Sequence, residues 1–160
     1  MAGNRVYRGN ECDPQCSLMV TNTNDDGIGS LRHAIECAAD GDTITFDPSL
    51  STQQILLTTG TISINKSLLI EQISTDLIEF CTSNIGPILH FASGTSTLVN
   101  AILCSSLEQD KHGRALINSA ILTLNNVVIK DNSSTVGLGS SMFNSGTLTI
   151  VGDTKIIIQN

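Results

Sequence analysis

The sequence predicts an all-β protein, a β-solenoid of about four rungs with a capping α-helix near the N-terminus. Three observations support this fold class: a repeat of 26 residues, short strand-like segments separated by turn residues, and one helical pattern ahead of them. Repeats of this length are typical of stacked supersecondary units, which bury their apolar faces only against one another. Because these units consist of short strands, we expect a stack of β-structure.

The repeat is clearest in residues 91–98, 117–124 and 143–150, and a more diverged copy occupies residues 61–64. The equivalent residues are Ser93, Ser119 and Ser145, then Thr97, Thr123 and Thr149, then Leu98, Leu124 and Ile150. Alternate residues of a strand face opposite sides of a sheet. The inward side chains are therefore expected to be Ile62, Ile64, Ser96, Leu98, Leu122, Leu124, Val127, Ile129, Leu148 and Ile150.

The helical pattern lies between a favourable N-cap, Ser30, and a stop at Gly41. Its apolar face consists of Leu31, Ala34, Ile35 and Ala38, at helical spacing. An open solenoid exposes its core at both ends, so this helix is suited to cover the first rung. Strands are predicted over residues 17–22, 42–46, 55–58, 61–64, 67–71 and 77–81.

The domain organisation follows from these elements. Residues 1–16 are predicted to be an irregular lead-in, and residues 17–160 to be one parallel β-helix domain. The cap of this domain covers residues 17–50, and its rungs cover residues 51–160. Two segments interrupt the repeat and are expected to protrude as loops, residues 71–87 and 105–114.

The composition argues against several classes of protein. The net charge of −7 and the scattered basic residues argue against a nucleic-acid partner, which requires clustered Lys and Arg. No apolar run is long enough for a membrane span. Aromatic residues make up only 3% of the chain, which suits a core of stacked aliphatic side chains. Nothing in the sequence indicates a cofactor.

Five cysteines leave several arrangements open: Cys12, Cys16, Cys37, Cys81 and Cys104. Cys12 and Cys16 could pair with each other, or either could pair with Cys37, in an oxidising compartment. For Cys81 and Cys104, buried free thiols are an equally good interpretation. The spacing of the cysteines and histidines does not favour a zinc site.

The segment from Val20 to Ile35, which reads VTNTNDDGIGSLRHAI, is followed by DTITF at residues 42–46. Together they resemble the N-terminal entry motif of bacterial right-handed parallel β-helix surface proteins, the type akin to polymorphic outer-membrane repeats and large adhesins. The resemblance covers roughly residues 17–72. It implies a right-handed parallel stack, export, and a bacterial surface or secreted setting. It implies no activity, because that family is defined mostly by its architecture.

The same motif implies structural roles in the cap for Ser30, Leu31, Arg32, Ile35 and Asp42. Arg32 would lie beside the apolar helix face, where we expect it to form an ion pair with a nearby acid such as Asp42. The stack is short for this family, so the chain is expected to be a terminal module of a larger protein.

Two patterns in the sequence are candidates for a functional site, one for calcium binding and one for carbohydrate cleavage. Asn22, Asn24 and Asp26 begin a calcium-loop pattern, but its twelfth position is His33 where a bidentate Glu is required, so these residues are expected to shape a turn. Carbohydrate-active β-helices need clustered carboxylates on neighbouring rungs. The acids here, Asp76, Glu79, Asp131 and Asp153, do not occupy equivalent rung positions.

The leading hypothesis is a non-enzymatic structural or adhesive module of a bacterial cell-surface or secreted protein, with its export signal outside this chain. The candidate partner-binding residues are Glu108, Asp110, Lys111 and His112 in the second loop, and Ile156 and Ile158 in the last strand. One alternative is a terminal domain recognised by secretion or anchoring machinery. Its exposed C-terminal edge would then add strands from a protein partner or from the continuation of a larger chain. A surface glycan is the other candidate ligand, and a polysaccharide lyase or hydrolase is the remaining alternative.

Overall fold

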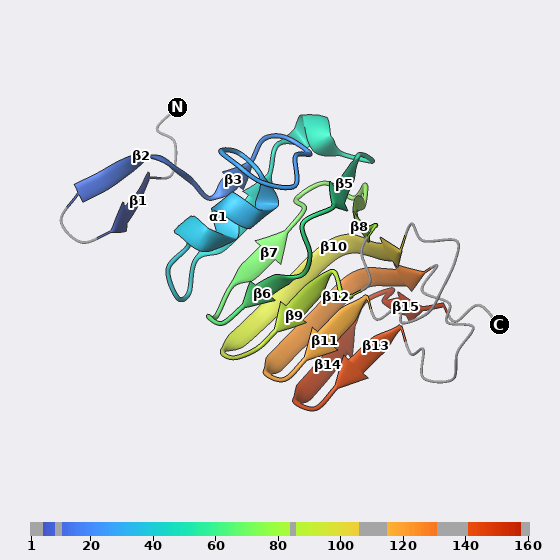
Figure 1. The fold of residues 1–160 in the computed structure, drawn as a ribbon. Coiled ribbons are helices and arrows are strands. Elements are labelled where there is room, and N and C mark those ends of the chain that lie inside the picture. Colours follow the sequence, from blue (N-terminus) through green and yellow to red (C-terminus); the bar gives the residue numbers. More distant parts are fainter. Residues whose placement is uncertain (1–4, 9–10, 84–85, 106–114, 131–140, 158–160) are drawn as a thin grey trace.

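The computed structural model describes residues 5–8, 11–83, 86–105, 115–130 and 141–157, with side chains from residue 15 onward apart from that of Ser105. In this part of the chain the protein is a β-solenoid of about four turns with parallel sheets, preceded by one α-helix (Figure 1). The predicted fold class is therefore confirmed. None of the helices described is long and apolar enough to cross a membrane.

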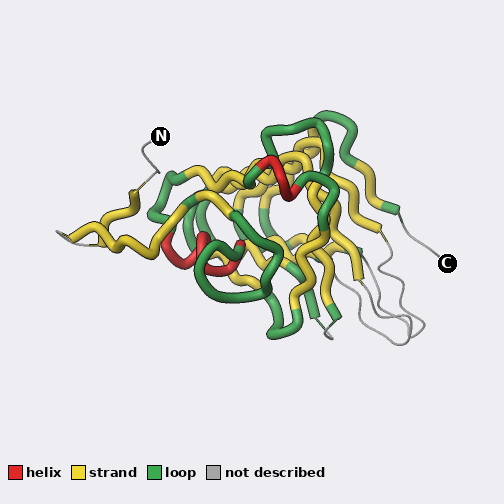
Figure 2. Tube along the Cα trace, turned by 90° about the horizontal axis from the view of Figure 1, so that it is seen from above, coloured by secondary structure: helices red, strands yellow, loops and turns green. Residues whose placement is uncertain are grey.

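The chain begins with strands β1 (Arg5–Arg8) and β2 (Glu11–Ser17), which pair in antiparallel fashion. This pair replaces the irregular lead-in expected from the sequence, because the two segments satisfy each other's main-chain hydrogen-bonding groups. Figure 2 shows that the pair projects sideways from the coils. Strand β3 (Met19–Val20) and helix α1 (Leu31–Cys37) follow and begin the solenoid.

The remaining strands follow one another around successive coils. The first coil holds β4 (Thr43–Phe46), β5 (Gln54–Leu57) and β6 (Ile62–Ile64), with a short 3-10 helix, η1 (Pro48–Leu50), between the first two. The second holds β7 (Leu69–Glu71), β8 (Ile78–Thr82) and β9 (Leu89–Phe91). The third and fourth hold β10 (Thr95–Ser105) with β11 (Leu116–Asn118), and β12 (Ile121–Lys130) with β13 (Met142–Asn144). The chain then continues into β14 (Thr147–Val151) and β15 (Lys155–Ile156).

Two parallel sheets form the walls of the stack. The larger sheet has the strand order β14-β12-β10-β7-β4-β3, with β5, β8 and β15 beside this path. The smaller sheet has the order β13-β11-β9-β6. Every strand of the stack is thus paired with the equivalent strand of the neighbouring coil, and the coils stack in register.

The core lies between the two sheets and consists mostly of aliphatic side chains. Of the predicted inward side chains, those in the first four coils are buried: Ile62, Ile64, Ser96, Leu98, Leu122, Leu124, Val127 and Ile129. In β14, Leu148 is half-buried and Ile150 is 49% exposed. These last two positions differ because no described coil stacks beyond them.

The long strands β10 and β12 each turn a corner at a residue with positive φ. Asn100 has φ 56° and Asn126 has φ 54°, and Gly152 has φ 63° at the same corner of the next coil. Asparagine and glycine are the residues that adopt this left-handed conformation most readily. Their spacing of 26 residues therefore places one corner of the solenoid at the same point in three successive coils.

The register of the smaller sheet differs from the simple 26-residue alignment at one step. Phe91 lies beside Asn118, whereas the alignment of the repeat places it against Ile117. The connection from β9 to β10 holds three residues and that from β11 to β12 holds two, so the extra residue is absorbed in a turn. Both Phe91 and Asn118 are fully buried.

Residues 71–87 do not simply protrude as a loop. They contain β8, which pairs with β5 on one side and β10 on the other, and its side chains Ile78, Phe80 and Thr82 are buried. Residues 72–77, between β7 and β8, form a longer version of one corner of the solenoid. In the next two coils the same corner is turned by a single residue, Asn100 or Asn126.

Candidate functional site

The cap is the first of two candidate sites at the ends of the stack. Ser30 is the N-cap of α1, and its hydroxyl oxygen accepts a hydrogen bond of 3.2 Å from the backbone N–H of His33. Leu31 and Ile35 are 1% and 3% exposed and belong to the main hydrophobic core. The helix therefore presents its apolar face to the core at this end of the stack, and it lies beside β3 in Figure 1.

Arg32 joins the loop before the helix to the turn before β6. Its guanidinium donates to the Asp25 carboxylate at 2.9 Å and to the carbonyl oxygen of Gly60 at 2.8 Å. Asp42, the acid expected to pair with Arg32, instead accepts a 2.7 Å bond from the backbone N–H of Ala39. The expected pair is not formed because Asp42 follows the C-terminal end of α1, whereas Arg32 lies in its first turn.

Asp25 accepts hydrogen bonds from residues of the first coil as well as from Arg32. Its second carboxylate oxygen accepts bonds from the N–H and hydroxyl groups of Thr58 and from the N–H of Thr59. Burial raises the pKa of Asp25, but the hydrogen bonds from Arg32, Thr58 and Thr59 outweigh it and hold this pKa well below its usual value. Asp25 is therefore ionised at neutral pH and ties the cap to the first coil.

The residues of the calcium-like pattern form the turn that the sequence favoured. Asn22 donates from its side chain to the carbonyl oxygen of Ile28 at 2.9 Å, and its own side-chain oxygen accepts from the N–H of Asn24. Asp26 accepts from the N–H of Gly27 at 2.7 Å. These oxygens are thus engaged in local turn bonds.

Two disulfides are present among the described cysteines. Cys16 and Cys37 join the end of β2 to the end of α1, with their Cα atoms 5.5 Å apart. This pair is one of the arrangements that the sequence left open. Cys81 and Cys104 are bonded as well, with Cα atoms 4.6 Å apart, because they are direct partners in the neighbouring parallel strands β8 and β10.

The second candidate site is the end of the stack beyond which the described residues form no further coil, and we call it the open end. It consists of β13, β14 and β15, whose strand pairings within the described residues are with β11 and β12. Its exposed apolar side chains are Phe143 (45%), Ile150 (49%), Val151 (41%), Ile156 (37%) and Ile157 (43%). The inward residues of the coils below it, such as Leu98 and Leu124, are 0% exposed.

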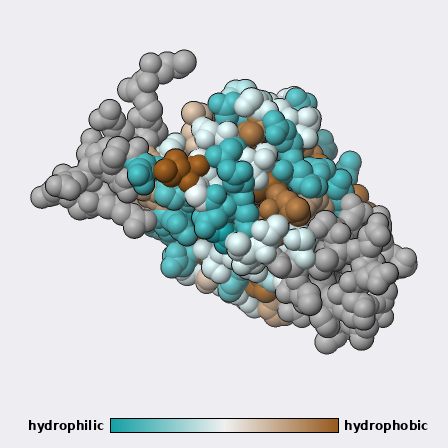
Figure 3. Space-filling model, turned by 45° about the horizontal axis from the view of Figure 1, so that its top comes forward, coloured by the Kyte–Doolittle hydropathy of each residue, from teal (hydrophilic) through white to brown (hydrophobic). Residues whose placement is uncertain are grey.

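The open end includes apolar side chains that sequence reasoning missed. Phe143 lies beside Ile117, and Ile117 lies beside His90 in the coil below. His90 in turn lies beside Ser63, so this outward position becomes apolar toward the open end. The signal was the change of residue type along one outward column, which is visible only when the register is known. On the face that Figure 3 shows, hydrophilic residues predominate, with smaller apolar patches among them.

The other predicted partner-binding residues have different outcomes. Ile156 lies in β15 and forms part of the open end. The remaining candidates lie outside the described residues: Glu108, Asp110, Lys111, His112 and Ile158.

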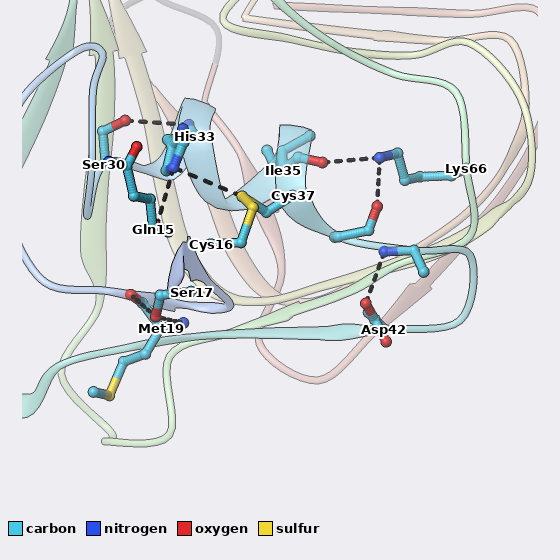
Figure 4. Close-up of a disulfide and its surroundings, with 12 residues drawn as sticks. Gln15, Cys16, Ser17, Met19, Ser30, His33, Ile35, Cys37, Asp42 and Lys66 are labelled. Atoms are coloured by element: carbon cyan, nitrogen blue, oxygen red, sulfur yellow. Dashed lines mark hydrogen bonds between the residues drawn. A yellow bond between two sulfur atoms is a disulfide. The ribbon is translucent and has the colours of Figure 1, made fainter. Parts of the chain in front are cut away.

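The acidic residues considered for catalysis do not gather in the described part of the chain. Glu79 forms an ion pair with Lys130 at 3.1 Å, Asp153 is exposed in the turn after β14, and Asp131 lies outside the described residues. An open depression of about 380 Å³ lies between α1 and β6. Its cation, Lys66, already donates to the carbonyl oxygens of Ile35 and Ala38, as Figure 4 shows for this end of the helix.

Comparison of this chain with protein-family models, curated proteins and solved structures found no match. The inferences about function therefore start from the cap, the disulfides and the open end.

Proposed function

We propose that the protein is a non-enzymatic structural or adhesive module of a bacterial cell-surface or secreted protein. The observation that carries this proposal is the difference between the two ends of the stack. The cap end is closed by α1, the Asp25–Arg32 ion pair and a disulfide. The open end presents exposed apolar side chains and the strands β14 and β15, which pair with β12 alone within the described residues. A unit closed at one end and open at the other is suited to terminate a longer stack.

The disulfides support an oxidising location. Disulfides persist in secreted and surface proteins and are rare where thiols are kept reduced. Four cysteines are paired here, and the Cys16–Cys37 bond ties the strand that precedes the solenoid to the helix that caps it. A protein exported to the cell surface would keep both bonds.

The outer face supports a structural role over catalysis. The repeated outward positions of β10, β12 and β14 carry Thr97, Thr123 and Thr149, which lie directly beside one another. Threonine favours strands and offers no acid or base for glycoside chemistry. Incubation with a panel of acidic polysaccharides is expected to release no product, and turnover that is lost in Glu79→Ala would contradict the proposal.

A second candidate function is docking by strand addition at the open end, to secretion or anchoring machinery or to a neighbouring coil. Within the described residues β14 and β15 pair with β12 alone, so their other edge can accept a further strand in the parallel arrangement used throughout the stack. The exposed side chains at inward positions, Ile150 and Ile156, would be covered by the inward residues of an added coil. This arrangement would give the module a defined attachment point.

The docking function is tested with Ile150→Lys/Ile156→Lys, compared with Ile73→Lys, a change at an isoleucine that is 73% exposed in the corner between β7 and β8. Each protein is fused to an export signal, produced in a Gram-negative host, and quantified at the cell surface and in assemblies. The double variant is expected to lose surface display or assembly, and the control to retain it. Equal display and assembly for all three would overturn the docking proposal.

A further inference from the structure

Three potential metal ligands meet where α1 lies against the end of β2. His33 and Cys37 are one helical turn apart on α1, and Cys16 approaches them from β2 (Figure 4). The ligand atoms of the three residues, Cys16 Sγ, Cys37 Sγ and a ring nitrogen of His33, all lie within 4.8 Å of one another. The spacing in sequence hides this cluster because Cys16 is brought to the helix by the fold.

We propose that this Cys16–His33–Cys37 cluster binds a zinc ion when its disulfide is reduced. With Zn–S near 2.3 Å and Zn–N near 2.0–2.1 Å, the edge between a sulfur and a nitrogen of a tetrahedral site is about 3.6 Å. His33 Nε2 lies 3.7 Å from Cys37 Sγ, which matches that edge. The nitrogen and one sulfur are therefore already placed for a shared metal ion.

The second sulfur reaches its position by a side-chain rotation after reduction. In a tetrahedral site two thiolate sulfurs are about 3.8 Å apart. The Cα atoms of Cys16 and Cys37 are 5.5 Å apart, so both thiolates can reach one ion without movement of the strand or the helix. The carbonyl oxygen of Gln15, 3.3 Å from His33 Nε2, gives up that contact when the nitrogen coordinates the metal.

The chemistry balances with an external reductant. Two electrons and two protons convert the disulfide to two thiols. A dithiol supplies both and becomes a disulfide itself, whereas a phosphine supplies the electrons, water supplies the protons and the oxygen atom, and the phosphine becomes its oxide. Zinc then binds both thiolates and the neutral imidazole, with release of the two thiol protons. Cys16 and Cys37 are 8% and 3% exposed, whereas His33 is half-buried, so solvent supplies the fourth ligand on the His33 side.

A second cluster, formed by Glu79, Cys81 and Cys104, is less suited to bind a metal ion. Its ligand atoms also lie within 4.8 Å of one another. However, the ammonium group of Lys130 is 3.1 Å from the Glu79 carboxylate and opposes a second positive charge there. The two clusters therefore serve as site and control within one chain.

The two states of the proposed site exclude each other, because a disulfide sulfur has no thiolate charge to offer a metal. Before export, in a reducing compartment, zinc would hold the strand and the helix together. After export, exchange with the disulfide of an oxidising partner would join Cys16 to Cys37 and release the zinc ion, while the partner disulfide takes up two electrons and two protons and becomes a dithiol. Zinc at this cluster would thus protect the thiols from premature pairing.

The test uses the full chain kept reduced by a phosphine, titrated with Co²⁺ as a spectroscopic probe and then competed with Zn²⁺. We expect about one equivalent of metal per chain, thiolate-to-cobalt absorption bands, and no binding after oxidation. His33→Ala is expected to weaken metal binding by about 10-fold or more. His90→Ala, the matched control, is expected to leave the affinity unchanged. Cys81→Ser/Cys104→Ser should bind as the wild type does, and Cys16→Ser/Cys37→Ser should not bind.

Unchanged affinity in His33→Ala, or equal binding by the oxidised chain, would overturn the proposal. A second measurement does not depend on any variant. The Cys16–Cys37 bond of the wild type is titrated with a dithiol with and without Zn²⁺, and its two peptides are followed by mass spectrometry. Zinc is expected to shift reduction of this bond to lower dithiol concentration without shifting that of Cys81–Cys104, and equal shifts or none would contradict a site here.

Discussion

Asn126 donates a 2.7 Å hydrogen bond from its side-chain nitrogen to the side-chain oxygen of Asn100, which turns the same corner one coil earlier. Asn100 in turn donates to the carbonyl oxygen of Gln72 at 2.7 Å. The corner thus combines left-handed backbone geometry with a column of side-chain bonds. The column ends at Gly152, which keeps the geometry and has no side chain to extend the bonds.

Two substitutions at Asn126 separate these contributions. Asn126→Gly keeps the left-handed conformation and loses the bond, which is expected to lower the free energy of unfolding by about 1 kcal/mol. Asn126→Ala also places an ordinary side chain at positive φ, which adds about 1–2 kcal/mol. Urea unfolding at neutral pH measures both. Equal stability of the two variants would show that the backbone geometry contributes nothing.

The Asp25–Arg32 pair is expected to stabilise the cap substantially. The two side chains are only 12% and 15% exposed, and Asp25 accepts three further bonds from Thr58 and Thr59. Asp25→Ala leaves the guanidinium with an unmet buried charge and should lower the free energy of unfolding by about 2–4 kcal/mol. The control is Glu79→Gln, at a pair whose side chains are 26% and 32% exposed, where the loss should stay below about 1 kcal/mol. A loss in Asp25→Ala no larger than that of the control would contradict the prediction.

The same carboxylate predicts how stability depends on pH. The pKa of Asp25 is lower in the folded protein than in the unfolded chain, so the folded state resists protonation. The stability that Asp25 contributes is therefore full above its unfolded pKa of about 3.9 and is lost as the pH falls below it. Between about pH 5 and pH 2, Asp25→Asn should lose less of its unfolding free energy than the wild type loses. Parallel curves for the two proteins would contradict this role.

Gly94 and Gly27 provide a matched test of close backbone packing. Both have φ 88°, but a Cβ at Gly94 would lie 2.6 Å from the carbonyl carbon of Lys66, whereas a Cβ at Gly27 would meet nothing within 4 Å. Gly27→Ala should cost about 1–2 kcal/mol of stability from the left-handed conformation alone. Gly94→Ala should cost about 3 kcal/mol or more, because neighbouring coils must also separate. Thermal and urea unfolding measure the stability of both variants. Similar losses of stability would show that the neighbouring coils can separate at Gly94 without a further cost in free energy.

The fold class was predictable because solenoid coils repeat their residue types. Alternation alone identified inward positions such as Ile64, Leu98 and Leu124, and the N-cap at Ser30 and the apolar spacing that follows it identified the helix. These signals lie within about one turn or one strand, and the 26-residue repeat orders them into stacked coils. Local periodicity and the repeat together were therefore sufficient to recognise the architecture.

The contacts between coils were harder to predict because they depend on turn lengths. One extra residue between β9 and β10 moves Phe91 to face Asn118, and the same kind of register places Cys81 beside Cys104. The partner of Arg32 was also missed, because the loop that carries Asp25 folds back on the first turn of α1. For the open end, the sequence predicted Ile156, but not the outward Phe143, whose neighbours are known only from pairing.

The Cys16–Cys37 bond has a mechanical consequence. It joins two residues that lie 21 positions apart in the sequence, and the covalent loop that it closes contains β3, the turn around Asp25 and α1. A tensile force applied to the N-terminal strands reaches the sulfur bridge before it reaches β3. The load then passes through Cys37 at the end of α1, so β3 is not peeled from β4 one hydrogen bond at a time. Under such a load, the first coil would therefore yield only after the bridge is reduced or the whole cap is pulled away.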